Sequence, residues 1–142
     1  MSLLFGGIIA LTMTYQSQAA AIEPAPVAVV EEADTAQLIR CTCYLDRGLT
    51  ATGTTTHWGV AAGCRDWFGE TVYLYTNDNG TKGEFIGAFV IEDTGFGIKL
   101  ENGRGSLEEG LSIDIWQPSE EAMNKWIKTY GDYVFIEFEQ KN

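Results

Sequence analysis

The chain has 142 residues, of which 45% are hydrophobic and 12% aromatic, enough for one folded domain with its own core and short additional segments. Its formal net charge of −11, from 20 acidic side chains against 9 lysines and arginines, disfavours nucleic acids and anionic lipid surfaces as partners because their phosphates would be repelled. The single histidine, His57, provides no pair of ligands at zinc-site spacing, so no zinc site is expected.

Residues 1–19 carry no charged side chain, and the apolar run over residues 3–13 is of signal-peptide length, whereas a bilayer span takes roughly 20 residues. Ser17, Gln18 and Ala19 give the small-residue pattern of a cleavage site. We therefore expect residues 1–19 to be a signal peptide or membrane anchor of an exported protein; a buried N-terminal helix is the alternative. Residues 20–36, with Pro24 and Pro26, are expected to link this segment to a domain over residues 37–142.

The three cysteines, Cys41, Cys43 and Cys64, are an odd number, which leaves at least one thiol outside any intramolecular disulfide. Cys41 and Cys43 are two residues apart in a strand-like run, so their side chains point to one face and are badly placed to bond each other. Either could reach Cys64. We expect buried, reduced thiols, with at most one disulfide involving Cys64.

Beyond residue 37 the sequence is mostly typical of strands. Residues 39–45 alternate apolar and polar side chains, as a half-buried strand does, and a Thr- and Gly-rich loop over residues 48–56 follows. Residues 71–76 and 83–92 favour two strands joined by a turn over residues 77–80, in which Asn79-Gly80 is a strong hairpin signal. Further strands are expected over residues 112–116 and 133–139.

One helix is expected after Ser119, which can cap its N-terminus, and acidic side chains in the first turn suit the helix dipole. Gly131 ends the helix. Its apolar face comprises Ala122, Met123, Trp126, Ile127 and Tyr130. Five or six short strands and one late helix predict a mainly β domain, a small closed or half-closed barrel.

Two aspartates stand at or near the ends of apolar strands. Asp93 follows the run over residues 89–92, and Asp114 lies between Ile113 and Ile115 with its side chain on the opposite face from theirs. A carboxyl group flanked in this way is partly desolvated, and a second carboxylate nearby raises its pKa further, which suits a general acid. The alternative is that each aspartate caps a turn or binds backbone amides.

Six different short motifs follow one another along the chain: Thr50-Ala51-Thr52-Gly53, Gly59-Val60-Ala61-Ala62, Gly69-Glu70-Thr71-Val72-Tyr73, Asp93-Thr94-Gly95, Ile113-Asp114-Ile115 and Glu121-Ala122. Together they resemble the three-Asp (3D) domain family of secreted stationary-phase and resuscitation-related proteins of Gram-positive bacteria. That domain is related to the catalytic barrel of membrane-bound lytic murein transglycosylase A. The resemblance covers residues 41–138.

The resemblance implies a six-stranded double-psi β-barrel with one late helix. It also implies cleavage of the bond between N-acetylmuramic acid and N-acetylglucosamine in peptidoglycan, with formation of a 1,6-anhydro ring. Asp114 would be the single acid and base, Asp93 its close supporter, and no metal or organic cofactor is implied. We expect a secreted, cell-wall-associated monomer whose partner is the glycan strand. Candidate substrate-binding residues are Thr52, Gly53, Asp66, Thr94, Gly95 and Trp116, and Tyr44, Trp58 and Trp67 are further candidates for stacking on sugars.

Two other interpretations stay open. The family's first aspartate, which follows its Val-Ala-Val segment, has no counterpart in register here, since Asp66 lies three or four positions later. A non-catalytic cell-wall-binding module is therefore an alternative. Asp93-Thr94-Gly95 also matches the bare motif of an aspartic protease, which would need a dimer so that two aspartates share a proton.

Overall fold

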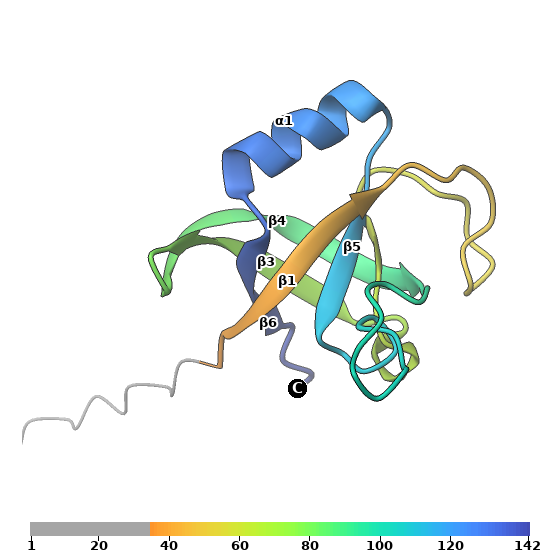
Figure 1. Ribbon diagram of the computed structural model, residues 1–142, viewed down its shortest axis with the longest axis horizontal. Coiled ribbons are helices and arrows are strands. Elements are labelled where there is room, and N and C mark those ends of the chain that lie inside the picture. Colours follow the sequence, from red (N-terminus) through yellow and green to blue (C-terminus); the bar gives the residue numbers. More distant parts are fainter. Residues whose placement is uncertain (1–34) are drawn as a thin grey trace, which may run out of the picture. The chain divides into compact units, whose positions relative to one another are not determined.

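The computed structural model describes residues 35–142 (Figure 1). The expected export segment over residues 1–19, and nearly all of the expected linker over residues 20–36, lie outside the described residues. In the described part of the chain, no helix is both long enough and apolar enough to cross a bilayer.

Over residues 35–142 the fold is mainly β, with a single α-helix late in the chain, as the sequence predicts. The helix, α1 (Glu120–Tyr130), lies between the last two strands, and a short 3-10 helix, η1 (Arg65–Trp67), follows the second strand. The strands are β1 (Gln37–Tyr44), β2 (Val60–Ala62), β3 (Thr71–Asp78), β4 (Thr81–Asp93), β5 (Ser112–Trp116) and β6 (Tyr133–Phe138).

All six strands belong to one sheet, in the hydrogen-bonded order β1-β5-β2-β4-β3-β6, and the sheet closes because β6 also pairs with β1. β1 runs parallel to β5 and β2 parallel to β4, whereas the other four pairs are antiparallel. If β1, β2 and β3 exchange places with β4, β5 and β6, every parallel pair is replaced by a parallel pair and every antiparallel pair by an antiparallel pair. The first three strands and the last three are therefore equivalent in their pairing.

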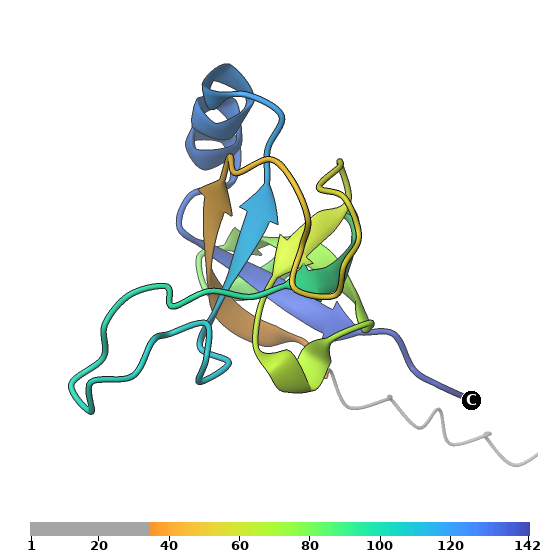
Figure 2. The ribbon, with the colours of Figure 1, turned by 90° about the vertical axis from the view of Figure 1, so that its right-hand side faces the viewer.

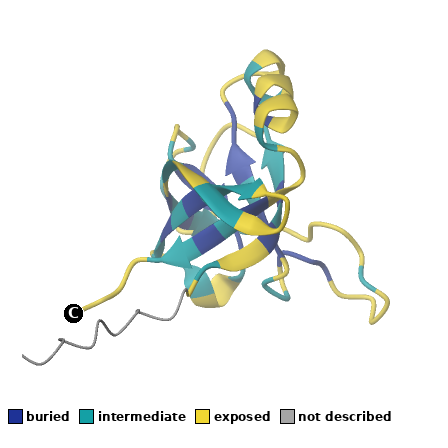
Figure 3. Cartoon of the chain, turned by 90° about the vertical axis from the view of Figure 1, so that its left-hand side faces the viewer, coloured by how far each residue is buried: buried dark blue, intermediate teal, exposed yellow. Residues whose placement is uncertain are grey.

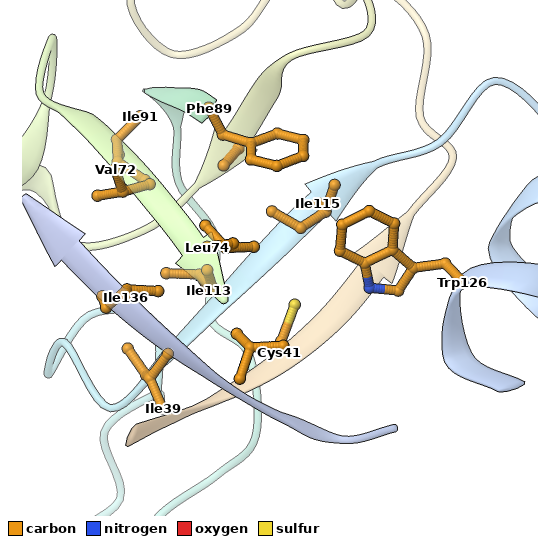
Figure 4. Packing of buried hydrophobic residues seen from close by; sticks show 12 residues of the cluster. Ile39, Cys41, Val72, Leu74, Phe89, Ile91, Ile113, Ile115, Trp126 and Ile136 are labelled. Carbon is orange, nitrogen blue, oxygen red and sulfur yellow. The ribbon is translucent and has the colours of Figure 1, made fainter. Parts of the chain in front are cut away.

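The interior of this sheet is filled by aliphatic side chains that alternate along the strands. Ile113 and Ile115 of β5 are fully buried, and each such burial contributes about 1.5–3 kcal/mol. Figure 4 shows the indole of Trp126 beside Ile115 and Cys41, so α1 covers one end of the core. The buried cluster consists of Ile39, Cys41, Ala61, Val72, Leu74, Phe89, Ile91, Ile113, Ile115, Trp126, Val134 and Ile136.

Helix α1 follows the sequence prediction at both ends. The Ser119 hydroxyl accepts a hydrogen bond from the Ala122 amide, and Gly131 ends the helix with φ 73°. The expected apolar face is too wide, however, because Ile127 is 40% exposed while Trp126 is buried. Figure 3 shows the outer side of the helix exposed, since only one narrow stripe of it reaches the barrel.

Two features of the fold position the site. β2 was not predicted as a strand, because three residues are too few to show a period, yet it lies between β4 and β5 with all its residues buried. Two long connections flank this strand: residues 45–59 leave the upper end of β1 and residues 94–111 enter the lower end of β5 (Figure 2). The first connection returns to the end of β4, where the Thr52 amide donates to the Glu92 carbonyl.

Candidate active site

A row of residues across three adjacent strands brings the two candidate aspartates together. Ala62 of β2 pairs with Asp93 of β4 on one side and with Asp114 of β5 on the other. A shift in register between Ala61 and Ala62 places Asp93, and not Glu92, opposite Ala62, as a β-bulge does. At normal strand spacing the two aspartate backbones are roughly 10 Å apart. Only the methyl group of Ala62 lies between them in this row.

Asp114 faces away from the core, because its neighbours Ile113 and Ile115 fill the interior. It is nevertheless half-buried, and burial raises the pKa of its carboxyl group to about 6. Its Oδ1 atom is buried and forms no hydrogen bond with any residue between 35 and 142. An aspartate that caps a turn would have such a bond, so Asp114 does not fit that structural role.

Asp93 is held by three hydrogen-bond donors. Its Oδ1 accepts from the backbone amides of Ala51 at 3.1 Å and Thr94 at 2.9 Å, and its Oδ2 accepts from the Tyr44 hydroxyl at 3.1 Å. Its backbone carbonyl also accepts from the Gly63 amide at 3.0 Å. These contacts come from β1, the 45–59 connection and the start of the 94–111 connection, and they fix the orientation of the carboxyl group.

Tyr44, the last residue of β1, donates to Asp93 and also lies within the electrostatic influence of Asp114. Burial, together with the negative charges of Asp93 and Asp114, raises the pKa of its hydroxyl above the ordinary value. The hydroxyl therefore stays protonated at neutral pH and remains a donor to Asp93. The sequence indicated Tyr44 only as a sugar-stacking candidate, because its place beside β5 depends on the β1–β5 register, which pairs Thr42 with Asp114.

The 45–59 connection carries two of the predicted substrate-binding residues, Thr52 and Gly53, both exposed. The Thr52 amide donates to the Glu92 carbonyl at 3.1 Å, which ties the loop to the end of β4. The hydroxyl groups of buried Thr50 and of Thr52 are hydrogen-bonded at 3.2 Å. Gly53 adopts φ 90°, a conformation that favours glycine. Since the Ala51 amide binds Asp93, this tight turn lies against that aspartate.

Asp66, Thr94 and Gly95, the three other predicted binding residues near Asp93, line a cavity of about 470 Å³. Arg65 and Arg104 line it as well, from η1 and from the 94–111 connection. Neither aspartate of the central row lies in the cavity wall, but Thr94 directly follows Asp93. Sequence reasoning missed both arginines, because 39 positions separate them and nothing local marks either one.

The predicted stacking aromatics differ in exposure. Trp116 is 6% exposed and its indole donates to the Asp46 carbonyl at 2.9 Å, so it supports the 45–59 connection and leaves no open ring face. Trp67 packs edge-on against Phe138 with ring centroids 5.1 Å apart. Trp58 is 55% exposed and is the open aromatic surface among these three.

The cysteines of the described chain are all free thiols, with Cys41 buried and Cys43 and Cys64 half-buried. Burial raises the pKa of the Cys43 thiol to about 11, so it stays protonated at neutral pH. Over residues 35–142, no group of three His, Cys, Asp or Glu side chains is arranged to hold a metal ion.

No protein-family model matches this chain, and no curated protein matches it. The case for a function therefore depends on the geometry of the residues themselves.

Proposed function

We propose that this protein is a lytic transglycosylase that cleaves peptidoglycan glycan strands. The observation that carries the proposal is Asp114, a half-buried carboxyl group with a pKa of about 6. Asp114 lies on β5 on one side of β2, and Asp93 lies on β4 on the other side. A carboxyl group of this kind holds its proton close to neutral pH and can act as a general acid. The family resemblance of the sequence supports the same assignment.

In the proposed reaction, protonated Asp114 donates its proton to the glycosidic oxygen as an oxocarbenium-like centre develops on the N-acetylmuramic acid ring. The carboxylate that results then removes the proton from the 6-hydroxyl of the same ring. That oxygen bonds to the anomeric carbon, and the product is a 1,6-anhydro sugar. One carboxyl group serves both halves, so no water attacks and no second carboxylate at hydrolase spacing is needed.

Asp93 supports this chemistry in the proposal without donating a proton. Held by Tyr44, Ala51 and Thr94, it presents fixed acceptor oxygens on the far side of Ala62. Such a group can accept a hydrogen bond from a sugar hydroxyl and so position the ring over Asp114. Thr52 and Gly53, on the turn that covers Asp93, are proposed to contact the same sugar.

We propose that the barrel is of the double-psi type, which the two-fold equivalence of its strand pairing supports. We also propose that the domain acts at the cell wall as a monomer without a cofactor. The net charge of −11 disfavours nucleic acid as a partner.

Digestion of purified sacculi with the purified protein tests the activity directly. Mass spectrometry should find muropeptides that end in 1,6-anhydro-N-acetylmuramic acid. Products with only ordinary reducing ends would mean that water attacks, and the proposed ring closure would be wrong.

One observation favours a non-catalytic wall-binding module as the second candidate. Ala62 and Gly63 stand where the family's first aspartate is expected, and a Cβ atom at Gly63 would approach Trp67 at 3.2 Å and Ile91 at 3.3 Å. An aspartate does not fit at Gly63 without movement of both neighbours. Binding of the protein to sacculi without any release of muropeptides would support this candidate, and unchanged activity of Asp66→Asn would show that Asp66 does not replace the missing group.

A further inference from the structure

The cavity of about 470 Å³ beyond Thr94 takes no part in the proton transfers proposed above. Two of the chain's 9 lysines and arginines, Arg65 and Arg104, line this one cavity together with the acidic residues Asp66 and Glu108, although the net charge of the whole chain is −11. Cations gathered in a hollow on an acidic protein indicate an anionic ligand.

Arg65 lies on one side of the cavity, at the start of η1. Its guanidinium lies over the ring of Phe68 at 5.8 Å, which orients the group without using its N–H donors. Within residues 35–142 it forms no ion pair. The side chain is exposed and lines the cavity, so its N–H donors are available to a ligand.

Arg104 lines the cavity from the 94–111 connection. Its Nε atom forms an ion pair with Glu109 at 2.5 Å, which holds one edge of the guanidinium. The side chain is still 63% exposed, so the two terminal nitrogens can meet a ligand. An arginine held on one edge and open on the other is suited to bind a carboxylate through two parallel hydrogen bonds.

The two acidic residues of the wall, Glu108 and Asp66, differ in whether they are available to a ligand. Glu108 is committed to the loop, because its Oε2 accepts from the Gly105 amide at 3.0 Å. Asp66 is exposed on η1, next to Arg65. The cavity thus offers the N–H donors of Arg65 and Arg104 to a carboxylate and the carboxylate of Asp66 to an amine. A ligand that carries both groups, such as a peptide, matches this lining better than a simple anion does.

The cavity is joined to the candidate active site through Thr94. The Thr94 amide donates to Asp93 Oδ1, and its hydroxyl donates to the Gly63 carbonyl at 2.9 Å. One residue therefore forms part of the cavity wall and also holds Asp93. The cavity wall therefore begins at the residue that directly follows Asp93.

We propose that this cavity binds the peptide stem of peptidoglycan, with Arg65 and Arg104 holding a stem carboxylate. The inference rests on the proposed function, because it takes the glycan strand as the ligand at Asp93. It adds that the protein distinguishes strands by their peptides. Strands whose stems carry free carboxylates are then bound more tightly than strands whose stems are amidated.

Calorimetric titration with two soluble probes tests this. The first probe is the disaccharide N-acetylglucosaminyl-N-acetylmuramic acid bearing a tetrapeptide with free carboxylates, and the second is the same compound with those carboxylates converted to amides. The wild-type protein should bind the first about tenfold more tightly, a difference of about 1.4 kcal/mol, because hydrogen bonds to a charged group are stronger than those to a neutral amide. Arg65→Ala and Arg104→Ala should each remove most of that preference and leave binding of the amidated probe unchanged.

Lys128→Ala is the matched control, because it removes an exposed cation from the last turn of α1, outside the cavity. It should keep the wild-type preference, and circular dichroism should show that all three variants are folded. Equal affinity of the wild type for both probes would overturn the inference, as would an arginine variant that weakens both probes alike. The probes lack the bond that is cleaved, so a preference seen without any anhydro product from sacculi would refute the catalytic proposal and leave the cavity assignment standing.

Discussion

Asp93, at the end of β4, and Asp114, in the middle of β5, both lie beside Ala62, but the surroundings of their side chains differ. Asp93 accepts three hydrogen bonds, two of them from backbone amides. Asp114 is half-buried, its Oδ1 has no partner within residues 35–142, and burial raises its pKa to about 6. The same type of side chain is thus a fixed hydrogen-bond acceptor at Asp93 and a carboxyl group with a raised pKa at Asp114.

The difference arises from the chain that follows each aspartate. After Asp93 the backbone leaves the sheet, so the Thr94 amide is free to turn back to the carboxyl group. After Asp114 the strand continues through Ile115, and the amides there are used in pairing with β1 and β2. An aspartate at a strand end is solvated by backbone donors, whereas one within a strand is not.

The largest effect is expected for activity. Asp114→Asn should lower the release of anhydro-muropeptides by about 10²–10⁴-fold, because an amide cannot donate and then retrieve a proton. Asp93→Asn should reduce the rate severely but leave residual turnover, since Asp93 is proposed to position the sugar. Product release from sacculi, followed by mass spectrometry, measures both. A wild-type rate for Asp114→Asn would show that the acid lies elsewhere.

The same substitution should stabilise the fold at neutral pH. The pKa of Asp114 is raised in the folded state, so below about pH 4 it is protonated whether folded or unfolded, and asparagine brings no charge-related gain. Between about pH 4 and pH 6 the unfolded chain releases this proton more readily than the folded wild type, which loses stability as pH rises, and above about pH 6 the folded protein carries the charge half-buried. Asp114→Asn should then be more stable by up to about 3 kcal/mol at pH 8, measured by denaturant unfolding. An equal stability difference at pH 4 and pH 8 would contradict this.

The pH dependence of turnover is the third test. Because the acid must be protonated, the wild-type rate should fall above pH 6 by about tenfold per unit, or about 100-fold by pH 8. Initial rates on sacculi between pH 5 and pH 8 would show it. A rate that still rises over this range would mean that a base limits the reaction, which does not fit Asp114 in the assigned role.

The comparison also shows what the sequence could and could not predict. Burial of Asp114 followed from Ile113 and Ile115, and the strands β1 and β3 to β6 followed from alternation and turn residues. The short strand β2 has no period to detect, yet it sets the spacing of the two aspartates. The Tyr44 contact with Asp93 spans 49 positions and depends on strand register, which local patterns do not encode.

The smallest effect is expected for Tyr44→Phe, which removes one of the three donors to Asp93. Two backbone donors remain, so the loss should be about 1 kcal/mol of unfolding free energy. Tyr73→Phe is a matched control, because its hydroxyl also donates to a carboxylate, Glu139 at 3.0 Å, but on the exposed surface. Its melting temperature should stay close to that of the wild type, whereas that of Tyr44→Phe should fall by several degrees. If both variants melt alike, the Tyr44 hydroxyl does not help to hold Asp93. If instead Tyr44→Phe loses stability and Asp93→Asn removes that difference in the double variant, the two side chains are coupled, as their contact requires.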